Sequence, residues 1–517
     1  MSLILHKNIA CMAIIGKLLK KSNQINYKRV VKRGKSHATQ RETLVTLLDY
    51  AKNTSFGLAH FFTKVVNDKN PVKTYQHITP ITEYEDFYSL WLSTTIEGKK
   101  DHTWPGRVKY FALSSGTTGS PSKRIPVTEQ MIRSFQKTSV RQLSTLHDLN
   151  LSEHFYSASA LAVGGSTKLT KKRKHIEGDL SGILKKHTSL IVSPITKPGS
   201  KIASMKDWNQ KLEAMIEKAP KWNIGIIAGI PSWCIMLMER IVERYGLTSI
   251  HDMWPNLEVY VHGGVFMQPY LPRLEKVLGK PIHLLDTYLA SEGYFAYQIA
   301  PHSEGMKLIL NTGVFYEFIP FTSEYFDEEG QVRDKHTAFT LSEIQEGVDY
   351  AMVISTNAGL WRYLIGDLVR FTNVSAQELV ITGRIRQYLS LVGEHISLEN
   401  INSAIITCAS SMGIEISEYC IYADIECQKH VWFVGCDDPC DEQALIQNLD
   451  NQLCALNDDY ASARKYNLKA PEIKVLPVQR FYTFMKESGK MGSQHKFPRV
   501  LNVEQAKRWL TFLSLNS

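Results

Sequence analysis

Apolar residues recur at helical spacing in the first part of the chain. Between Arg41 and Lys52 they fall on one face of a helix, at Leu44, Leu47, Leu48 and Ala51. Residues 1–100 are therefore predicted to be mainly helical. The stretch from Met1 to Lys20 is also apolar, but polar and basic residues interrupt it early and no A-x-A cleavage pattern follows. We expect an amphipathic helix there that docks on the main domain, not a signal peptide.

From Tyr110 onward, short apolar runs alternate with stretches of helical periodicity. The runs predict strands at residues 110–113, 190–192, 224–228, 259–262 and 283–285. Examples of the predicted helices are residues 209–218 and 270–278. Because strands and helices alternate, the pattern indicates a mostly parallel sheet.

The second half of the chain has a different pattern. Residues 305–380 are rich in turns and predicted strands, at 307–310, 314–319, 350–355 and 368–371. After a change in composition near residues 383–393, helices are predicted at 396–412 and 442–460, and strands at 419–424 and 430–435. We predict an α/β fold in three parts: an N-terminal helical arm (1–40), a large domain with parallel-rich sheets and a β-rich subdomain (41–385), and a small, mobile α+β domain (386–517).

Composition and charge narrow the classes of function. The 517 residues carry a formal net charge of +9. Basic residues gather at 17–35 and 168–186 without interleaved aromatic residues, so nucleic acid is not an expected partner. Solvated basic faces explain these clusters best, and the alternative is a positive field that attracts anions such as ATP and carboxylates. No run reaches about 18 uninterrupted apolar residues, so no stable membrane insertion is expected. The eight cysteines form no regular framework, which indicates reduced thiols in a cytoplasmic protein.

A Ser/Thr/Gly-rich run follows the first predicted strand of the α/β region. It contains Ser114, Ser115, Gly116, Thr117 and Thr118, and Lys123 follows shortly after. Small residues let backbone N–H groups surround phosphate oxygens, while hydroxyls and the lysine add hydrogen bonds and charge. The spacing is not that of a Walker loop. Such a run alone is more often a plain turn, and its position after a strand makes phosphate binding an equal alternative.

Three further motifs lie at the ends of predicted strands, where α/β sheets usually bind ligands. The first holds Thr287, Tyr288, Ser291 and Glu292; its tyrosine suits stacking on a base, and its carboxylate suits Mg²⁺. Gly263, Gly264 and Val265 allow a flat ring to approach the backbone. Asp367, which follows a glycine, is placed to accept hydrogen bonds from ribose hydroxyls. Each of these alone is more often an ordinary turn.

Two Gly-flanked basic stretches complete the set. Residues 382–386, which include Arg384, lie between the two predicted domains and suit a hinge. Residues 488–499 hold Lys490 and Lys496 in a Gly-rich loop, which suits a flexible arm that reaches a phosphate. Taken alone, residues 382–386 are better explained as an ordinary linker, and residues 488–499 as a solvated basic loop.

Together, in this order, the motifs resemble the adenylate-forming superfamily of acyl-CoA synthetases, adenylation domains and luciferases. The nearest resemblance is to the acyl acid amido synthetases of the plant auxin-responsive promoter (Gretchen Hagen) family and their bacterial relatives. It rests on Ser114 to Lys123, Tyr288 to Glu292, Trp361 to Asp367 and Gln494 to Arg499. It covers the chain from about residue 40 to the C-terminus. The loop departs from plant members at Gly119 and Ser120, and the plant acyl-pocket residues do not transfer to this chain.

The resemblance implies a role for each residue. Those that hold the ATP phosphates are Ser114, Ser115, Gly116, Thr117, Thr118 and Lys123. Those around the adenine are Gly263, Gly264, Val265 and Tyr288, and Thr287 is a further nucleotide-binding residue. Ser291 and Glu292 lie near the α-phosphate, where Glu292 also holds Mg²⁺. Asp367 binds the ribose, with Arg384 close by, and residues 384–388 form the hinge. Lys496 reaches the adenylate, and Lys490 is the second candidate.

The implied protein is an ATP- and Mg²⁺-dependent ligase, present as a monomer or weak dimer. It adenylates a carboxylic acid, transfers the acyl group to an amine such as an amino acid, and releases AMP and pyrophosphate. Two alternatives stay open: an adenylating ligase with a thiol acceptor such as coenzyme A, and a catalytically inactive ligand-binding homologue. The residues name neither the acid nor the amine. His262 is expected to be a structural histidine of a buried strand, and no general base is assigned.

Overall fold

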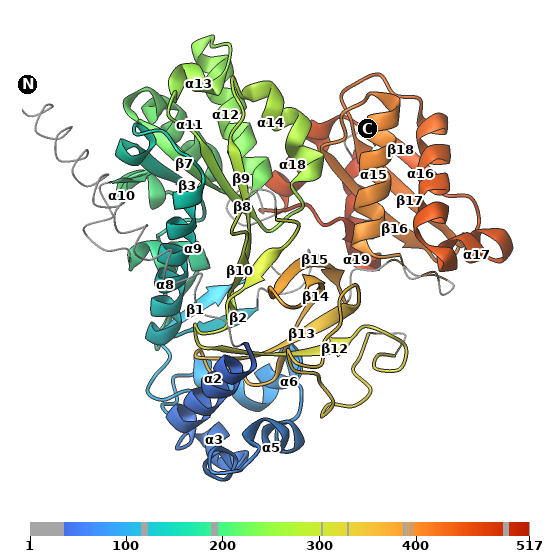
Figure 1. The fold of residues 1–517 in the computed structure, drawn as a ribbon. Coiled ribbons are helices and arrows are strands. Elements are labelled where there is room, and N and C mark those ends of the chain that lie inside the picture. The colour runs from blue at the N-terminus through green and yellow to red at the C-terminus, as the bar shows by residue number, and fades with distance from the viewer. Residues whose placement is uncertain are drawn as a thin grey trace, which may run out of the picture.

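The computed structural model describes residues 36–114, 123–187, 195–300, 303–327, 330–385, 389, 391, 394, 396–489 and 496–515 (Figure 1). The described part of the chain begins with short helices: α2 (Ser36–Ala51), α3 (Ser55–Ala59), α4 (Phe62–Val66), α5 (Pro71–Ile78), α6 (Tyr84–Phe87), a π-helical turn (Tyr88–Leu92) and α7 (Ser93–Ile96). The predicted apolar face of α2 is buried, because Leu44, Leu48 and Ala51 have no exposed surface. These helices pack beside one end of a large sheet (Figure 1).

That sheet has eleven strands and changes character along its width. One half is antiparallel, in the order β12 (Val314–Pro320), β13 (Asp349–Thr356), β14 (Tyr363–Asn373), β15 (Glu378–Arg384), β11 (Met306–Leu308) and β10 (Gly293–Tyr297). The other half is parallel, in the order β9 (His283–Ala290), β8 (Val259–Gly263), β7 (Ile224–Gly229), β3 (Ser159–Val163) and β6 (Thr196–Lys197). The halves meet at the antiparallel pair β9–β10.

Helices accompany the parallel half, as the alternating pattern predicted. They are α10 (Ser200–Ala203), α11 (Trp208–Lys218), α12 (Pro231–Tyr245), α13 (Ile250–Met253) and α14 (Leu271–Val277). Two further helices pack elsewhere: α8 (Glu129–Thr145) lies against β10, and α9 (Leu180–Lys186) lies against a smaller second sheet. The start of α12 is set by Pro231 and its end by Gly246, which has a left-handed conformation. The α/β fold class is confirmed. The predicted strand at 190–192 lies outside the described residues.

A second, four-stranded sheet places the predicted phosphate loop. Its order is β2 (Arg124–Val127), β1 (Tyr110–Leu113), β5 (Ile176–Gly178) and β4 (Thr170–Lys171). Strands β1 and β2 form an antiparallel hairpin, and the N–H of Ser114 donates to the carbonyl of Lys123 at 3.0 Å. The predicted loop therefore spans the end of this hairpin, between Ser114 and Lys123.

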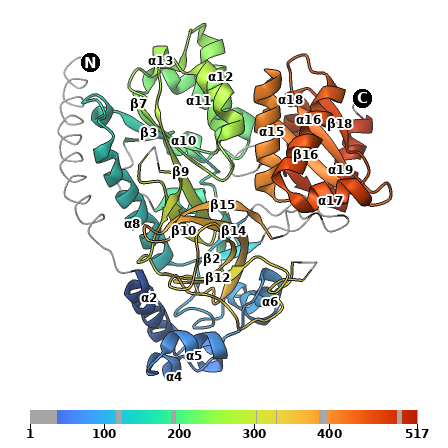
Figure 2. The same ribbon diagram turned by 45° about the vertical axis from the view of Figure 1, so that its right-hand side comes forward.

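The C-terminal part forms a third layer, with strands in the order β18 (Glu472–Leu476), β17 (Lys429–Gly435), β16 (Glu418–Asp424) and β19 (Val500–Leu501). Its helices are α15 (Leu398–Met412), α16 (Glu442–Leu456), α17 (Asp458–Tyr466), α18 (Val478–Glu487) and α19 (Val503–Leu515), and Figure 2 shows them around this small sheet. The single helix predicted at 442–460 is wrong. Asn457 interrupts it, because its backbone is extended and its side chain accepts from the N–H of Tyr460 to begin α17.

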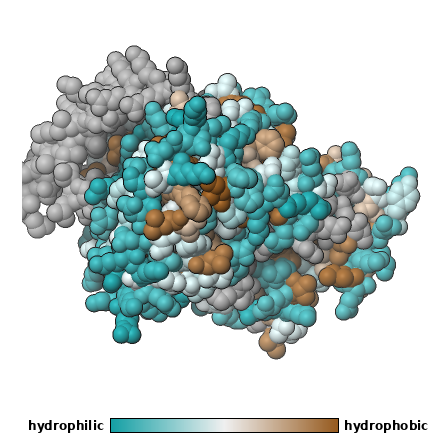
Figure 3. Space-filling model, turned by 90° about the horizontal axis from the view of Figure 1, so that it is seen from below, coloured by the Kyte–Doolittle hydropathy of each residue, from teal (hydrophilic) through white to brown (hydrophobic). Residues whose placement is uncertain are grey.

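One apolar cluster joins the C-terminal layer to the helices of the parallel half. Its buried members include Trp233 of α12 and Leu274 of α14 together with Phe433 of β17, Phe481 of α18 and Trp509 of α19. The face seen in Figure 3 is mostly hydrophilic, with separate apolar patches. Among the described residues, no helix combines the length and apolar character needed to cross a membrane.

Candidate active site

The predicted nucleotide-binding residues gather where the parallel and antiparallel halves of the large sheet meet. Glu292 lies in the turn between β9 and β10, and Tyr288 lies on β9. Asp367 comes from β14 and Arg384 from the end of β15. Residues far apart in the sequence are thus brought to one place by the pairing of strands. Asp367 lies within β14, which begins earlier than the strand predicted at 368–371.

Asp367 is the centre of a hydrogen-bonded group. Its Oδ2 accepts from the Tyr288 hydroxyl at 2.7 Å, and its Oδ1 accepts from Arg384 Nε at 2.6 Å. The Asp367 carboxylate raises the pKa of Arg384 further above its ordinary value. Burial, and next the charge of Asp367, raise the pKa of Tyr288 well above its usual range. The phenol therefore stays protonated, and its O–H donates the hydrogen bond to Asp367.

In the structure, the hydroxyl of Tyr288 is a hydrogen-bond donor to Asp367. Its side chain is 3% exposed, and its ring packs edge-on against Phe295 with the centroids 5.0 Å apart. The predicted stacking on adenine stays a prediction. Its hydroxyl contact with Asp367 was missed, because residues 79 positions apart give no spacing signal.

Glu292 is a buried carboxylate beside this group. It is 8% exposed. Burial, and then the negative charge of Asp367, raise the pKa of Glu292 to about 7, although Lys123 and Arg384 oppose this shift. A cation close to such a carboxylate would stabilise its ionised form. Within the described ranges, no three or more His, Cys, Asp or Glu side chains are arranged to hold a metal ion by themselves. The donor set fits Mg²⁺, which is commonly held by one or two carboxylates together with substrate phosphates and water.

Lys123 stands at the end of the hairpin that frames the phosphate loop. Its Nζ lies 5.1 Å from the centre of the Tyr84 ring, and the Tyr84 hydroxyl accepts from the N–H of Arg124 at 2.9 Å. These contacts fix the hairpin end near Glu292. Ser115, Gly116, Thr117 and Thr118 lie outside the described residues, so their phosphate contacts stay predictions.

Gly263 and Gly264 lie at the carboxyl end of β8. A Cβ on Gly263 would come within 2.4 Å of the Thr287 carbonyl oxygen, so close strand packing requires this glycine. The Thr287 hydroxyl donates to the carbonyl of His262 at 2.7 Å. Gly264 has a positive φ of 82° and lies beside Val265, which is partly buried. Ser291 is buried next to Glu292.

Lys496, from the C-terminal layer, reaches the carboxyl end of β8. Its Nζ donates to the carbonyl oxygen of Gly264. The residue as a whole is exposed, while desolvation of its ammonium and then the charge of Arg384 lower the pKa of Lys496 to about 8. Lys490, the second candidate, lies outside the described residues, as do 386–388 of the predicted hinge.

Arg499, three residues after Lys496, anchors the lysine. Its guanidinium donates to Glu418 Oε2 at 2.7 Å and to the Tyr270 hydroxyl at 3.0 Å. Tyr270 belongs to the 3₁₀ turn Gln268–Tyr270 before α14, while Glu418 begins β16. The contact ties the C-terminal layer to the parallel half. The arginine that ends the matched segment from Gln494 to Arg499 was the available signal, but the sequence did not reveal this role.

His262 fits its predicted structural role. It is 6% exposed, and desolvation lowers its pKa to about 4, so the ring is neutral near pH 7. Its Nδ1 lies 3.4 Å from Asp286 Oδ1.

Arg362 has a structural role. Its side chain and that of Glu317 have no exposed surface, and their ion pair measures 3.0 Å. The guanidinium also donates to the carbonyls of Gln76 and Thr79. Arg362, which lies in the matched segment from Trp361 to Asp367, therefore ties the N-terminal helices to the sheet.

Family models match the chain along most of its length. They describe the GH3 family N-terminal domain (residues 32–160 and 153–282), the GH3 family central domain (307–384) and the GH3 family C-terminal domain (399–505). All the described site residues except Tyr288, Ser291, Glu292 and Thr287 fall within these matched ranges.

Two curated relatives show the range of similarity. An indole-3-acetic acid-amido synthetase, GH3.2 of Arabidopsis thaliana, is 28% identical, but the alignment covers 34% of each protein. The chain thus spans about a third of that relative's length. A jasmonoyl–L-amino acid synthetase, JAR6 of Nicotiana attenuata, is 21% identical over 92% of this chain and 93% of its own.

Solved structures agree on the fold. The GH3.15 acyl acid amido synthetase superposes with a TM-score of 0.76 at 17% identity, covering 93% of each chain. A 2-hydroxyisobutyryl-CoA ligase in the postadenylation state gives a TM-score of 0.62 at 12% identity. Motifs, site geometry and the matched domains agree, and the chain belongs to the GH3 family.

Proposed function

We propose that this protein is an acyl acid amido synthetase: an ATP-dependent ligase that activates a carboxylic acid as its adenylate and transfers the acyl group to an amine, in particular an amino acid. The observation that carries the proposal is the convergence of Lys123, Glu292, Asp367, Arg384 and Lys496 at one edge of the large sheet. The family relatives named as amido synthetases support the same reaction.

The first half-reaction makes a poor electrophile reactive. The acid's carboxylate attacks the α-phosphorus of ATP, and pyrophosphate leaves. Lys123 and the loop from Ser114 hold the phosphates, while Asp367 holds the ribose hydroxyls. Lys496 adds positive charge where negative charge develops on the transferring phosphorus, which is the electrostatic contribution that usually dominates such sites.

The second half-reaction transfers the acyl group. The amine attacks the acyl carbonyl, AMP leaves, and the amine's proton passes to solvent. Since Lys496 belongs to the C-terminal layer, a movement of that layer withdraws the lysine and opens the site to the acceptor. Residues 384–388 are the proposed hinge.

Mg²⁺ is the proposed metal. Glu292 would hold it together with phosphate oxygens, where it supplies positive charge that offsets the charge of the phosphates. We also propose a cytoplasmic monomer or weak dimer. Every cysteine in the described part of the chain is a free thiol, in keeping with a reducing compartment.

Acid-dependent exchange of labelled pyrophosphate into ATP tests the first half-reaction, over a panel of carboxylic acids. Product mass spectrometry with amino acids, and separately with coenzyme A, tests the acceptor. An amide product supports the proposal. A thioester formed faster than any amide would identify the thiol-using alternative, and the absence of ATP binding would indicate an inactive homologue.

A further inference from the structure

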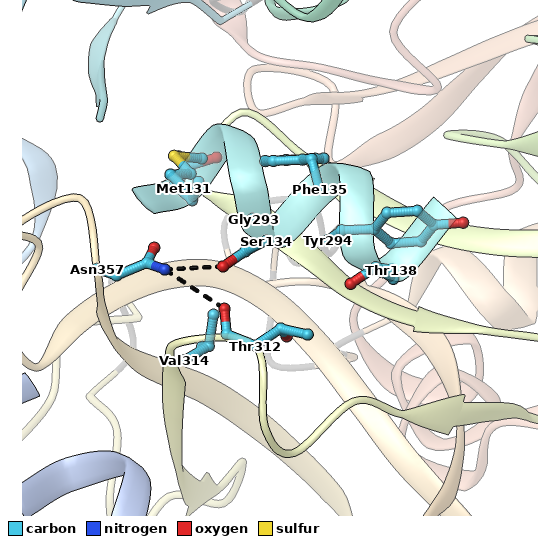
Figure 4. Close-up of a pocket in the computed structure, with 10 residues that line it drawn as sticks. Met131, Ser134, Phe135, Thr138, Gly293, Tyr294, Thr312, Val314 and Asn357 are labelled. Carbon is cyan, nitrogen blue, oxygen red and sulfur yellow. Dashed lines mark hydrogen bonds between the residues drawn. The ribbon is translucent and has the colours of Figure 1, made fainter. Parts of the chain in front are cut away.

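A small cavity lies directly beside Glu292. It is bounded on one side by α8 and on the other by Gly293 and Tyr294 of β10 and by the segment around Thr312 (Figure 4). Its free volume is about 10 Å³, which is the room that about one water molecule needs. Whatever enters this space is therefore the size of a single polar or methyl group.

Two walls of the cavity carry buried hydroxyls with no hydrogen-bond partner. Thr138 of α8 has no exposed surface and Thr312 is 5% exposed. Neither Oγ1 has a partner among the described residues. Protein hydroxyls that are buried are normally paired, so two orphans around one cavity indicate a missing polar group. Figure 4 shows both threonines at this cavity.

Apart from the buried carboxylate of Glu292, the remaining polar side chains that line the cavity are already paired. Asn357 Nδ2 donates to Ser134 Oγ at 2.9 Å and contacts the Thr312 carbonyl at 3.5 Å. The Tyr294 hydroxyl donates to Gln142 Oε1 at 2.5 Å. These pairs fix the walls and leave the two threonine hydroxyls directed to a guest. The apolar parts of Met131 and Phe135 close the space against a larger group.

We infer that Thr138 and Thr312 bind a hydroxyl group of the acid substrate, so that the protein selects a small hydroxylated carboxylic acid over its deoxy counterpart. The inference rests on the proposed function. An acid whose carboxylate faces the phosphate site at Glu292 places its substituent in the adjoining cavity. A hydroxyl both donates and accepts, and so satisfies both threonines. A hydrocarbon substituent leaves both unpaired.

The test compares acids that differ by one hydroxyl: lactate with propanoate, 3-hydroxybutanoate with butanoate, and 4-hydroxybenzoate with benzoate. For each pair, kcat/KM of pyrophosphate exchange is measured with the wild-type protein, T138V, T312V and the double variant. We expect at least one pair in which the wild type prefers the hydroxy acid by about tenfold or more. Thr138→Val and Thr312→Val should each remove most of that preference.

Folding does not confound this test, because replacing an unpaired buried hydroxyl by a methyl group removes an unsatisfied atom. Thr145→Val is the matched control. Thr145 lies on the same helix and is 3% exposed, but its hydroxyl already donates to the Gln142 carbonyl at 2.7 Å. T145V should keep the wild-type preference, and so should the conservative T138S.

The outcomes separate the inference from the function on which it rests. Exchange without a hydroxyl preference in any pair, or a preference unaltered in the double variant, overturns the inference and leaves the proposed function standing. The cavity then holds an ordered water. Where no acid supports exchange, calorimetric binding of the same pairs decides: equal binding within every pair overturns the inference independently of catalysis.

Discussion

Asp367 and Arg384 form an ion pair across two neighbouring strands, β14 and β15, with Nε donating to Oδ1 at 2.6 Å. The same carboxylate accepts from Tyr288 at 2.7 Å, so both of its oxygens are held in place. A carboxylate fixed in this way presents its remaining lone pairs in one direction, as a ribose diol requires.

Asp367→Ala should therefore reduce acid-dependent ATP–pyrophosphate exchange by at least about 100-fold, because nucleotide positioning and two hydrogen bonds are lost together. The matched control is Asp349→Ala in β13, an aspartate of the same sheet that pairs with Arg370 at 2.8 Å. D349A should keep exchange near the wild-type level. Equal loss in both variants would indicate damage to the sheet and count against a role for Asp367 in ATP binding.

Lys496 should give adenylation an alkaline limit. Its pKa is lowered to about 8, so the ammonium loses its proton as pH rises through that value and its charge no longer favours the reaction. Lys496→Arg keeps the charge at high pH and should move the fall in exchange to higher pH. Lys496→Met should lower exchange by about 100-fold at neutral pH.

Lys490→Arg is the comparison that assigns the lysine. If Lys496 is the group that acts, the pH profile of K490R matches the wild type. A limit that moves in K490R but stays in K496R would transfer the role to Lys490.

Glu292 should make stability fall with rising pH in the absence of ATP and Mg²⁺. Its pKa is raised from 4.5 to about 7 in the folded state. Between these values the folded state binds more protons than the unfolded state, so the free energy of unfolding decreases as pH rises. The decrease is complete above about pH 7 and amounts to at most about 3 kcal/mol.

Urea unfolding at about pH 5 and about pH 8 measures this effect. Relative to the wild type, E292Q should gain stability as pH increases, because glutamine does not ionise. Glu129→Gln, at a side chain that is 81% exposed, should give a difference that does not change with pH. His262 has the opposite sign, since its lowered pKa removes stability as pH falls. The comparison with E292Q cancels that contribution.

Arg362→Met should destabilise the protein by about 3–5 kcal/mol, because it leaves the Glu317 carboxylate buried without its partner. By contrast, Lys335→Ala should change the free energy of unfolding by less than about 1 kcal/mol, since its ion pair with Asp86 is half exposed. Both are measured by chemical denaturation. A small loss in R362M would show that the hydrogen bonds to Glu317 are replaced by water.

The sequence predicted those features that depend on local pattern. The buried face of α2 and the strands β7 and β8 follow from apolar spacing alone. The motifs also included residues that the fold brings together, such as Glu292, Asp367 and Arg384, while the roles of these residues stay predictions. The GH3 resemblance is confirmed by the matched family domains.

Long-range pairing was beyond the reach of pattern. The Arg362–Glu317 ion pair joins residues 45 positions apart, and nothing in either segment marks the other. Tyr288 was predicted to border the adenine, but its hydroxyl contact with Asp367 depends on how the strands of the large sheet are arranged. The break at Asn457 had a local signal, a capping residue before α17, which helical periodicity outweighed.

The apolar cluster that joins α12 and α14 to α18 and α19 has a consequence for unfolding. Phe481, Phe484 and Trp509 form an aromatic core within the C-terminal layer, and Trp233 of α12 and Leu274 of α14 belong to the same buried cluster. Loss of either partner would expose the other's aromatic surface to water. Heating in the absence of nucleotide should therefore melt these two parts of the chain in one cooperative transition, so that the lysine arm disappears together with the sheet edge it serves.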